Sequence, residues 1–293
     1  MEIKIKNLTL TNDLLFRGIF GKKGNEHLLK ELVNAVLSYK NLPLITHIRL
    51  KSPITKIGHL VGKQNILDIL GVDNLQNQYA IEMQVLNHLF LRDRMSYYLA
   101  KLHTDQNLKG KPYSEIKKSV LICFMDENFY NDKYFFRTAQ MRSDVNYEQV
   151  VMDKLEFHLI EMKKLMTILQ NCDIIKMKEL EKWVYFIKNI DKTGDKNMET
   201  LLKENPAFNE AEKEYEEIIG DEEKRLLLLH QEIWEMDRIS EKACAREEGL
   251  SEGWNNGVRQ TKLETAKLMK RENCEISFIS KITGLSLNEI KDL

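Results

Sequence analysis

The sequence predicts an α/β fold, a mixed β-sheet flanked by helices, with an α-helical C-terminal half. Residues 119–125 form a continuous apolar run of strand length, which is typical of a central strand covered on both faces. Residues 66–85 hold two short apolar runs around a polar segment, which is the pattern of a β-hairpin. Apolar residues at helical spacing before and after these strands predict the helical layers.

Two helices are expected ahead of the sheet. Within residues 7–24, Asn12 and Asp13 precede a group of apolar residues, which predicts a short capped helix that ends at Gly21. Residues 26–39 predict a second helix with Asn25 as its cap. Its apolar residues fall on one face, which is expected to pack on the sheet.

The remaining elements are less strongly patterned. Residues 44–50 predict a short strand, 88–108 a helix, and 134–137 an aromatic strand. From about Asp153 the pattern is helical nearly to the end of the chain. Helical spacing is kept there by Leu155, Leu159, Met162, Leu165 and Leu169.

The predicted hairpin carries the most informative polar residues. Side chains on a strand alternate between its faces, so Glu82 and Gln84 point the same way. Asp68 lies inside an apolar run, where an unpaired carboxylate is costly to bury. If the two strands pair, Asp68 and Glu82 come together, and two converging carboxylates suit Mg²⁺. The alternatives are an Asp satisfied by backbone N–H groups and a Glu-x-Gln pattern on an ordinary solvated face.

Charge is distributed unevenly along the chain. The net charge of the 293 residues is −1, which by itself predicts no affinity for nucleic acid. Residues 1–124 carry 18 Lys and Arg against 10 Asp and Glu, a net of +8, whereas residues 125–293 carry 26 against 35, a net of −9. The basic half contains the carboxylate pair, which fits a catalytic domain that meets a polyanion. The alternative is an uneven distribution without functional meaning.

Several segments carry a resemblance to a known family. They include TNDLLFRGIFG at 11–21 and IEMQ at 81–84, together with 67–69, 94–98, 110–113, 120–124, 158–161 and 282–286. In their order and combination they resemble the PD-(D/E)XK nuclease superfamily, specifically its recombination-promoting nuclease and transposase branch. The resemblance implies a restriction-endonuclease-like core. It also implies that Asp68 and Glu82 bind metal and that Gln84 stands where the superfamily has lysine.

The function that follows is a metal-dependent DNA endonuclease, associated with recombination or mobile elements. Asp68 and Glu82 would hold Mg²⁺ or Mn²⁺ with the backbone carbonyl of Met83, and Gln84 would orient the attacking water. In the superfamily an acid of the first helix sometimes joins the site. Whether Asp13, Glu31 or neither does so here stays open, since each also fits a cap or a solvated position. The charge that a lysine would bring is missing, and the candidates to supply it are Lys63 and Arg94, with Tyr97 in support on the face of Arg94.

The alternative function is a nucleic-acid-binding or regulatory protein whose nuclease site has decayed. The intact acids argue against decay, and Gln84 leaves it open. Four cysteines, far apart and without a CxxC pair, favour a reducing compartment. The N-terminal residues lack the apolar region of a signal peptide, and no apolar run approaches 18 residues, so a cytoplasmic protein is expected.

The domain organisation expected from these patterns has three parts. Residues 1–165 form the nuclease core, 166–240 a helical extension, and 241–293 a tail. In the tail, Gly249, Gly253 and Gly257 recur every four residues, which would give either a smooth helical ridge or a flexible linker. Short helices around Gly284 resemble a helix-turn-helix, with DNA reading and oligomerisation both open. Cutting both strands with one site per chain favours a homodimer.

Overall fold

The structure is a computed structural model that describes residues 8–51, 68–85, 90–106, 108–170, 172–192 and 194–293. The chain divides into two compact units, Met1–Leu229 and His230–Leu293. The described residues of the first unit contain a six-stranded sheet in the order β1-β2-β3-β4-β6-β5. The strands are β1 (Ile48–Leu50), β2 (Ile69–Asp73), β3 (Gln78–Gln84), β4 (Ser119–Met125), β5 (Phe136–Arg142) and β6 (Val150–Glu161).

The sheet is mixed, as the sequence predicted. β3 and β6 both run parallel to β4, which lies between them, and the remaining neighbours pair antiparallel. The helices are α1 (Asp13–Phe20), α2 (Glu26–Tyr39), α3 (Leu91–Thr104), α4 (Met162–Leu169), α5 (Glu179–Asn189), α6 (Lys196–Glu204), α7 (Pro206–Gly220), α8 (Glu222–Arg271), α9 (Ile276–Thr283) and α10 (Leu287–Lys291). Among the described residues, none of these helices combines the length and the apolar character needed to cross a membrane.

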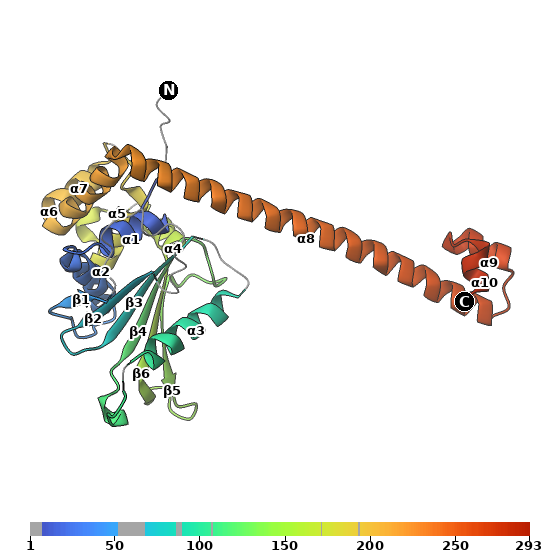
Figure 1. Ribbon diagram of the computed structural model, residues 1–293, viewed down its shortest axis with the longest axis horizontal. Helices are drawn as coiled ribbons and strands as arrows, with labels where there is room; N and C mark the ends of the chain where they lie inside the picture. Colours follow the sequence, from blue (N-terminus) through green and yellow to red (C-terminus); the bar gives the residue numbers. More distant parts are fainter. Residues whose placement is uncertain (1–7, 52–67, 86–89, 107, 171, 193) are drawn as a thin grey trace. The chain divides into compact units, whose positions relative to one another are not determined.

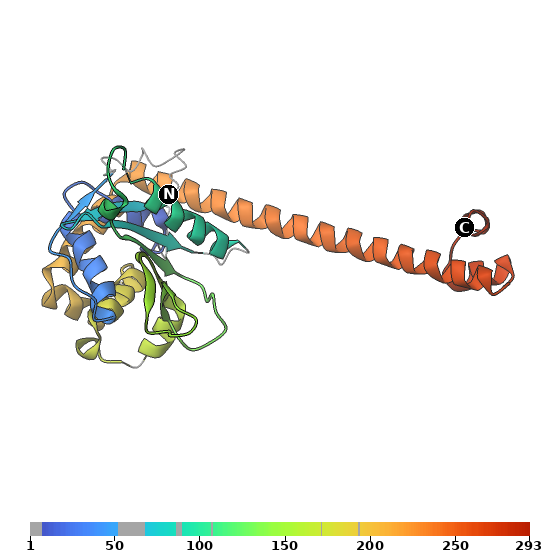
Figure 2. The ribbon, with the colours of Figure 1, turned by 90° about the horizontal axis from the view of Figure 1, so that it is seen from below.

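Helices cover both faces of the sheet (Figures 1 and 2). Ile81 and Met83 of β3 belong to the large core that α1, α2 and α5 build on one face. Ala80 of β3 and Cys123 of β4 belong to a smaller core under α3 on the other face. Because strand residues alternate, Glu82 and Gln84 point to the side of α3.

The elements nearest the carboxylate pair were predicted correctly. β4 has the expected bounds, and β2 and β3 form the expected antiparallel hairpin. In α1 the side chain of Asn12 accepts a hydrogen bond from the N–H of Leu15 at 3.2 Å, and Gly21 caps the other end. α2 has the expected bounds too, but Asn25 makes no side-chain capping bond and instead donates to the carbonyl of Ile19 at 3.0 Å.

The prediction of helix from Asp153 was wrong, because residues 150–161 form β6. Leu155, Leu159 and Met162 fit helical spacing, yet 155–161 also alternates between two faces. Phe157 and Leu159 pack toward α3, while His158 and Ile160 point to the other face. Pairing with both β4 and β5 settles the competition in favour of the strand. The helical pattern begins at Met162 with α4.

Other predicted elements shift by a few residues. The strand expected at 44–50 begins only at Ile48, and the strand expected at 134–137 begins at Phe136 and continues to Arg142. The helix expected at 88–108 is α3, with described residues 91–104 in helical conformation.

Helices after the sheet complete the main core. Trp183 of α5 packs its ring against Phe20 of α1 at 5.7 Å and against Phe208 of α7 at 4.4 Å. Phe186 joins them, at 5.2 Å from Phe208. The segment expected as a helical extension therefore supplies aromatic side chains to the same core as the sheet.

The second unit contains most of α8, with α9 and α10. Gly249, Gly253 and Gly257 all lie inside α8, so the helical alternative holds there. α9 ends at Gly284, whose φ of 70° is a left-handed conformation that suits glycine. α10 begins with a capping box formed by Ser286 and Glu289.

Candidate active site

Asp68 and Glu82 meet at the start of the hairpin. β2 pairs with β3 so that Ile69 lies opposite Ile81, and continuing this register places Asp68 opposite Glu82. The N–H of Asp68 donates to Oε1 of Glu82 at 2.8 Å. The N–H of Met83 donates to Oδ2 of Asp68 at 3.0 Å. Each carboxylate is therefore held by the backbone of the opposite segment.

Burial makes these carboxylates hard to ionise. Glu82 is only 2% exposed. Burial first, and then the negative charge of Asp68, raise the pKa of Glu82 well above its ordinary value. Burial first, and then the negative charge of Asp13, raise the pKa of Asp68 to about 6. The pair thus gathers more negative charge than its surroundings neutralise, and a cation would compensate for it.

Arg17 is a neighbour that sequence reasoning missed. It lies on α1, is buried, and its Nη1 is 4.0 Å from Oδ1 of Asp68. Its charge lowers the pKa of both Asp68 and Glu82 in opposition to burial. Within the described part of the chain, Nε and Nη2 of this guanidinium have no hydrogen-bond partner. The only signal in the sequence was an arginine inside the otherwise apolar α1.

Of the two helical acids, the structure brings Asp13 to the pair. Its charge acts on Asp68, so it lies within electrostatic reach of the site from the first turn of α1. Glu31 lies on α2, where it pairs with Lys30 at 3.2 Å and is partly exposed. No described contact joins Glu31 to the carboxylates.

Gln84 and Arg94 form the side of the site nearest α3. Gln84 is buried, and Nη1 of Arg94 lies 3.5 Å from its Oε1, at the long end of a hydrogen bond. Arg94 also donates to the hydroxyl of Tyr98 at 3.1 Å, with its guanidinium 5.4 Å from that ring. Its charge lowers the pKa of Asp68 and Glu82.

Tyr97 and Lys63, which the sequence suggested as supporting residues, are not placed at the site by the described contacts. Tyr97 is 59% exposed, and among the described residues its link to this group is the ring contact with Tyr98 at 6.3 Å. Tyr98, four residues after Arg94, is the tyrosine that holds the guanidinium, and the spacing i, i+4 was the signal that could have found it. Lys63 lies outside the described residues.

The donor set fits a hard divalent cation. Carboxylate oxygens have two lone pairs each, so the backbone donors leave capacity for a metal on Asp68 and Glu82. Mg²⁺ is commonly bound by one or two carboxylates and keeps several waters. The described residues contain no group of three or more His, Cys, Asp or Glu side chains arranged to hold a metal. The fit therefore rests on two acids and on main-chain or water oxygens.

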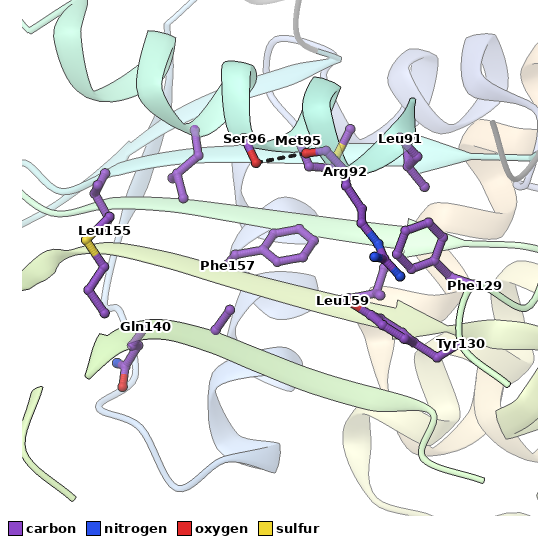
Figure 3. A pocket seen from close by; sticks show the side chains of 13 residues that line it. Leu91, Arg92, Met95, Ser96, Phe129, Tyr130, Gln140, Leu155, Phe157 and Leu159 are labelled. Carbon is purple, nitrogen blue, oxygen red and sulfur yellow. Dashed lines mark hydrogen bonds between the residues drawn. The ribbon is translucent and has the colours of Figure 1, made fainter. Parts of the chain in front are cut away.

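A groove lies on the same face of the sheet, beside α3 (Figure 3). Its volume is about 310 Å³, and most of its lining is apolar. At one end Arg92 lies over the rings of Phe129 and Tyr130, at 5.3 and 5.4 Å. Arg92 and Arg94 thus contact different sets of side chains. Arg94 contacts Gln84 and Tyr98, and its charge acts on both carboxylates.

A mixed sheet flanked by helices, with one acid before a strand and a second inside its antiparallel neighbour, defines a PD-(D/E)XK nuclease fold. The family described as PD-(D/E)XK nuclease family transposase matches residues 10–245, and the chain belongs to this family. Searches of curated proteins and of solved structures found no match to the chain.

Proposed function

We propose that the protein is a metal-dependent DNA endonuclease that hydrolyses phosphodiester bonds, acting in the cytoplasm in recombination or in the biology of mobile elements. The observation that carries the proposal is the reciprocal backbone support of Asp68 and Glu82, which holds a half-buried and a buried acid together. The class of enzyme, a nuclease, follows from the family, and the family makes DNA the expected substrate.

Asp68 and Glu82 would hold Mg²⁺ or Mn²⁺ with the carbonyl of Met83. A bound ion of this kind supplies a Lewis acid that polarises a phosphate and lowers the pKa of a water. Both acids have raised pKa values, so metal must displace protons from them and binds more tightly as the pH rises.

The other residues position the reactants. The contact of Arg94 with Oε1 of Gln84 leaves the amide N–H₂ of Gln84 to hold the attacking water. Arg94 brings the positive charge that lysine supplies in the superfamily, and it stabilises the negative charge that develops on the phosphate. Asp13 and Arg17 adjust the electrostatics of the acids from α1 and take no direct part in the chemistry.

The test is nicking of supercoiled plasmid with Mg²⁺, Mn²⁺, Ca²⁺ or EDTA. We expect cleavage with Mg²⁺ and Mn²⁺ and none with EDTA. Asp68→Ala and Glu82→Ala should abolish cleavage while DNA binding survives. Glu31→Ala is the matched control, because it removes an acid that no described contact joins to the pair. Cleavage by the double variant Asp68→Ala/Glu82→Ala at the wild-type rate would defeat the assignment.

The alternative is a DNA-binding protein with a decayed site. Gln84 in place of lysine is the observation that favours it. The same assay separates the two functions, since binding of DNA without cleavage in every metal would support decay. A homodimer is proposed as well, because each site faces one strand of a duplex.

A further inference from the structure

An apolar row runs along α8 in the second unit. Large apolar side chains lie exposed there, with Met236 66%, Leu250 64% and Trp254 75% exposed. Ile233, Ile239 and Val258 are exposed too. A large group of exposed apolar side chains on a protein surface is typical of a site that binds another molecule.

The spacing of the row is that of a coiled coil. Met236, Ala243, Leu250 and Gly257 recur every seven residues, and a second set offset by three or four residues recurs likewise. The second set is Ile233, Ser240, Glu247 and Trp254. Alternating steps of three and four build the seam through which two helices supercoil.

No described side chain of the second unit covers this seam. α9 and α10 pack on α8 through Leu263, Ala266 and Met269, further along the helix. A helix outside a packed core gains most of its stability by burying an apolar stripe on a partner. The seam therefore fits an additional helix.

Charge identifies the partner and its direction. Residues 230–237 carry three Asp and Glu and no Lys or Arg, and residues 246–252 carry three Glu against one Arg. Residues 238–245 carry two Lys and Arg against one Glu, and residues 253–260 carry one Arg and no acid. A parallel pair of identical helices would place acidic against acidic and basic against basic. An antiparallel pair of two copies brings the basic turns beside the acidic turns of the partner.

We propose that the seam of α8 is the interface of an antiparallel homodimer, with a second copy of this chain as its occupant and the two-fold axis close to Ala245. This arrangement places Ile233 opposite Gly257 of the other copy. It also places Met236 opposite Trp254, and Ser240 opposite Leu250. The fourth pair of the seam is Ala243 opposite Glu247. Two of the four pairs match a large apolar side chain with a small one, which lets the helices approach closely. Gly257, at which an added Cβ would meet no described atom within 4 Å, thereby gains a structural role.

The proposal deepens the homodimer of the proposed function, but it requires neither metal nor DNA. A failed dimer test leaves the nuclease assignment untouched, and an inactive protein leaves the dimer untouched.

The first test is the mass of the full-length protein by light scattering at tens of micromolar concentration. We expect twice the mass of one chain. Leu250→Glu, and independently Met236→Glu, should reduce it to the mass of one chain. Asn256→Glu is the control, because it adds the same charge on the opposite side of α8, and it should stay dimeric. A wild-type protein of single-chain mass, or a dimer that both seam variants retain, would overturn the proposal.

The second test is orientation. The full chain with Cys172→Ser, Cys244→Ser and Cys274→Ser receives either Ile233→Cys or Gly257→Cys, and the two forms carry tags of different size. Mixed and oxidised, they should form the disulfide between unlike chains. Disulfides only between like chains, which a parallel pair would give, would overturn the antiparallel arrangement.

Discussion

The backbone N–H of Asp68 lies 2.8 Å from Oε1 of Glu82 and donates a hydrogen bond to it. The N–H of Met83 returns a bond to Asp68 at 3.0 Å. The two acids are thus fixed by backbone hydrogen bonds before any cation enters. A site held by its own backbone in this way is preorganised, so little ordering is needed when the metal binds.

The first prediction concerns stability. The pKa of Asp68 rises in the folded chain from its ordinary 3.8 to about 6. Below pH 4 this carboxyl is protonated in both the folded and the unfolded chain, and the folded state keeps its full stability. As the pH rises through 6, the unfolded chain gives up the proton more readily than the folded chain, so the free energy of unfolding falls. Asp68→Asn cannot ionise, so at pH 8 and without metal its Tm should exceed that of the wild type by about 2–6 °C.

The measurement is thermal unfolding of both proteins at pH 4.5 and pH 8 with EDTA. The advantage of Asp68→Asn should shrink at pH 4.5, where Asp68 of the wild type is protonated. Saturating Mg²⁺ should raise the Tm of the wild type alone. Glu31→Gln serves as control and should change neither result. Equal Tm values at both pH values would refute the raised pKa of Asp68.

The second prediction concerns Gln84. Gln84→Ala should lower the cleavage rate by about 10²–10³, the usual effect of losing one positioned polar group. Gln84→Lys should keep or raise activity, since it restores the charge found in the superfamily. Single-turnover rates at saturating metal report the chemical step. Unchanged rates in both variants would show that Gln84 is a bystander.

The third prediction concerns Arg94. Its charge lowers the pKa of both acids, so Arg94→Met should raise these pKa values further. The pH–rate profile should then move to higher pH, and the maximum rate should fall by about 10-fold or more. Arg92→Met is the matched control, because Arg92 lies on the same helix but contacts Phe129 and Tyr130. An identical pH profile in Arg94→Met would contradict this electrostatic role.

Sequence reasoning worked best where a pattern admitted a single reading. The apolar run of β4 has the length of a strand, and the hairpin carries a polar turn between two such runs, so both elements were predicted. β6 failed because Leu155 and Leu159 satisfy helical and strand periods alike, and strand pairing decided between them. Arg17 was missed for another reason: its place beside Asp68 arises from packing of α1 on the sheet, which no local pattern encodes.

The last prediction concerns the tail. Residues 245–293 lie wholly in the second unit, and the carboxylate pair, Arg17 and Arg94 lie wholly in the first. Deleting 245–293 should therefore leave the fold of the core and the cleavage rate on short duplexes unchanged. The deletion removes Leu250, Trp254 and Gly257 from the seam of α8, so the dimer should dissociate. Nicks in one strand of the DNA should then replace double-strand breaks, and the affinity for long DNA should fall.

The test compares full-length and truncated protein side by side by light scattering and by DNA cleavage. A truncated protein that still forms dimers, binds long DNA equally well and still cuts both strands would defeat the role of the tail in assembly. A truncated protein that unfolds would show instead that the tail supports the core.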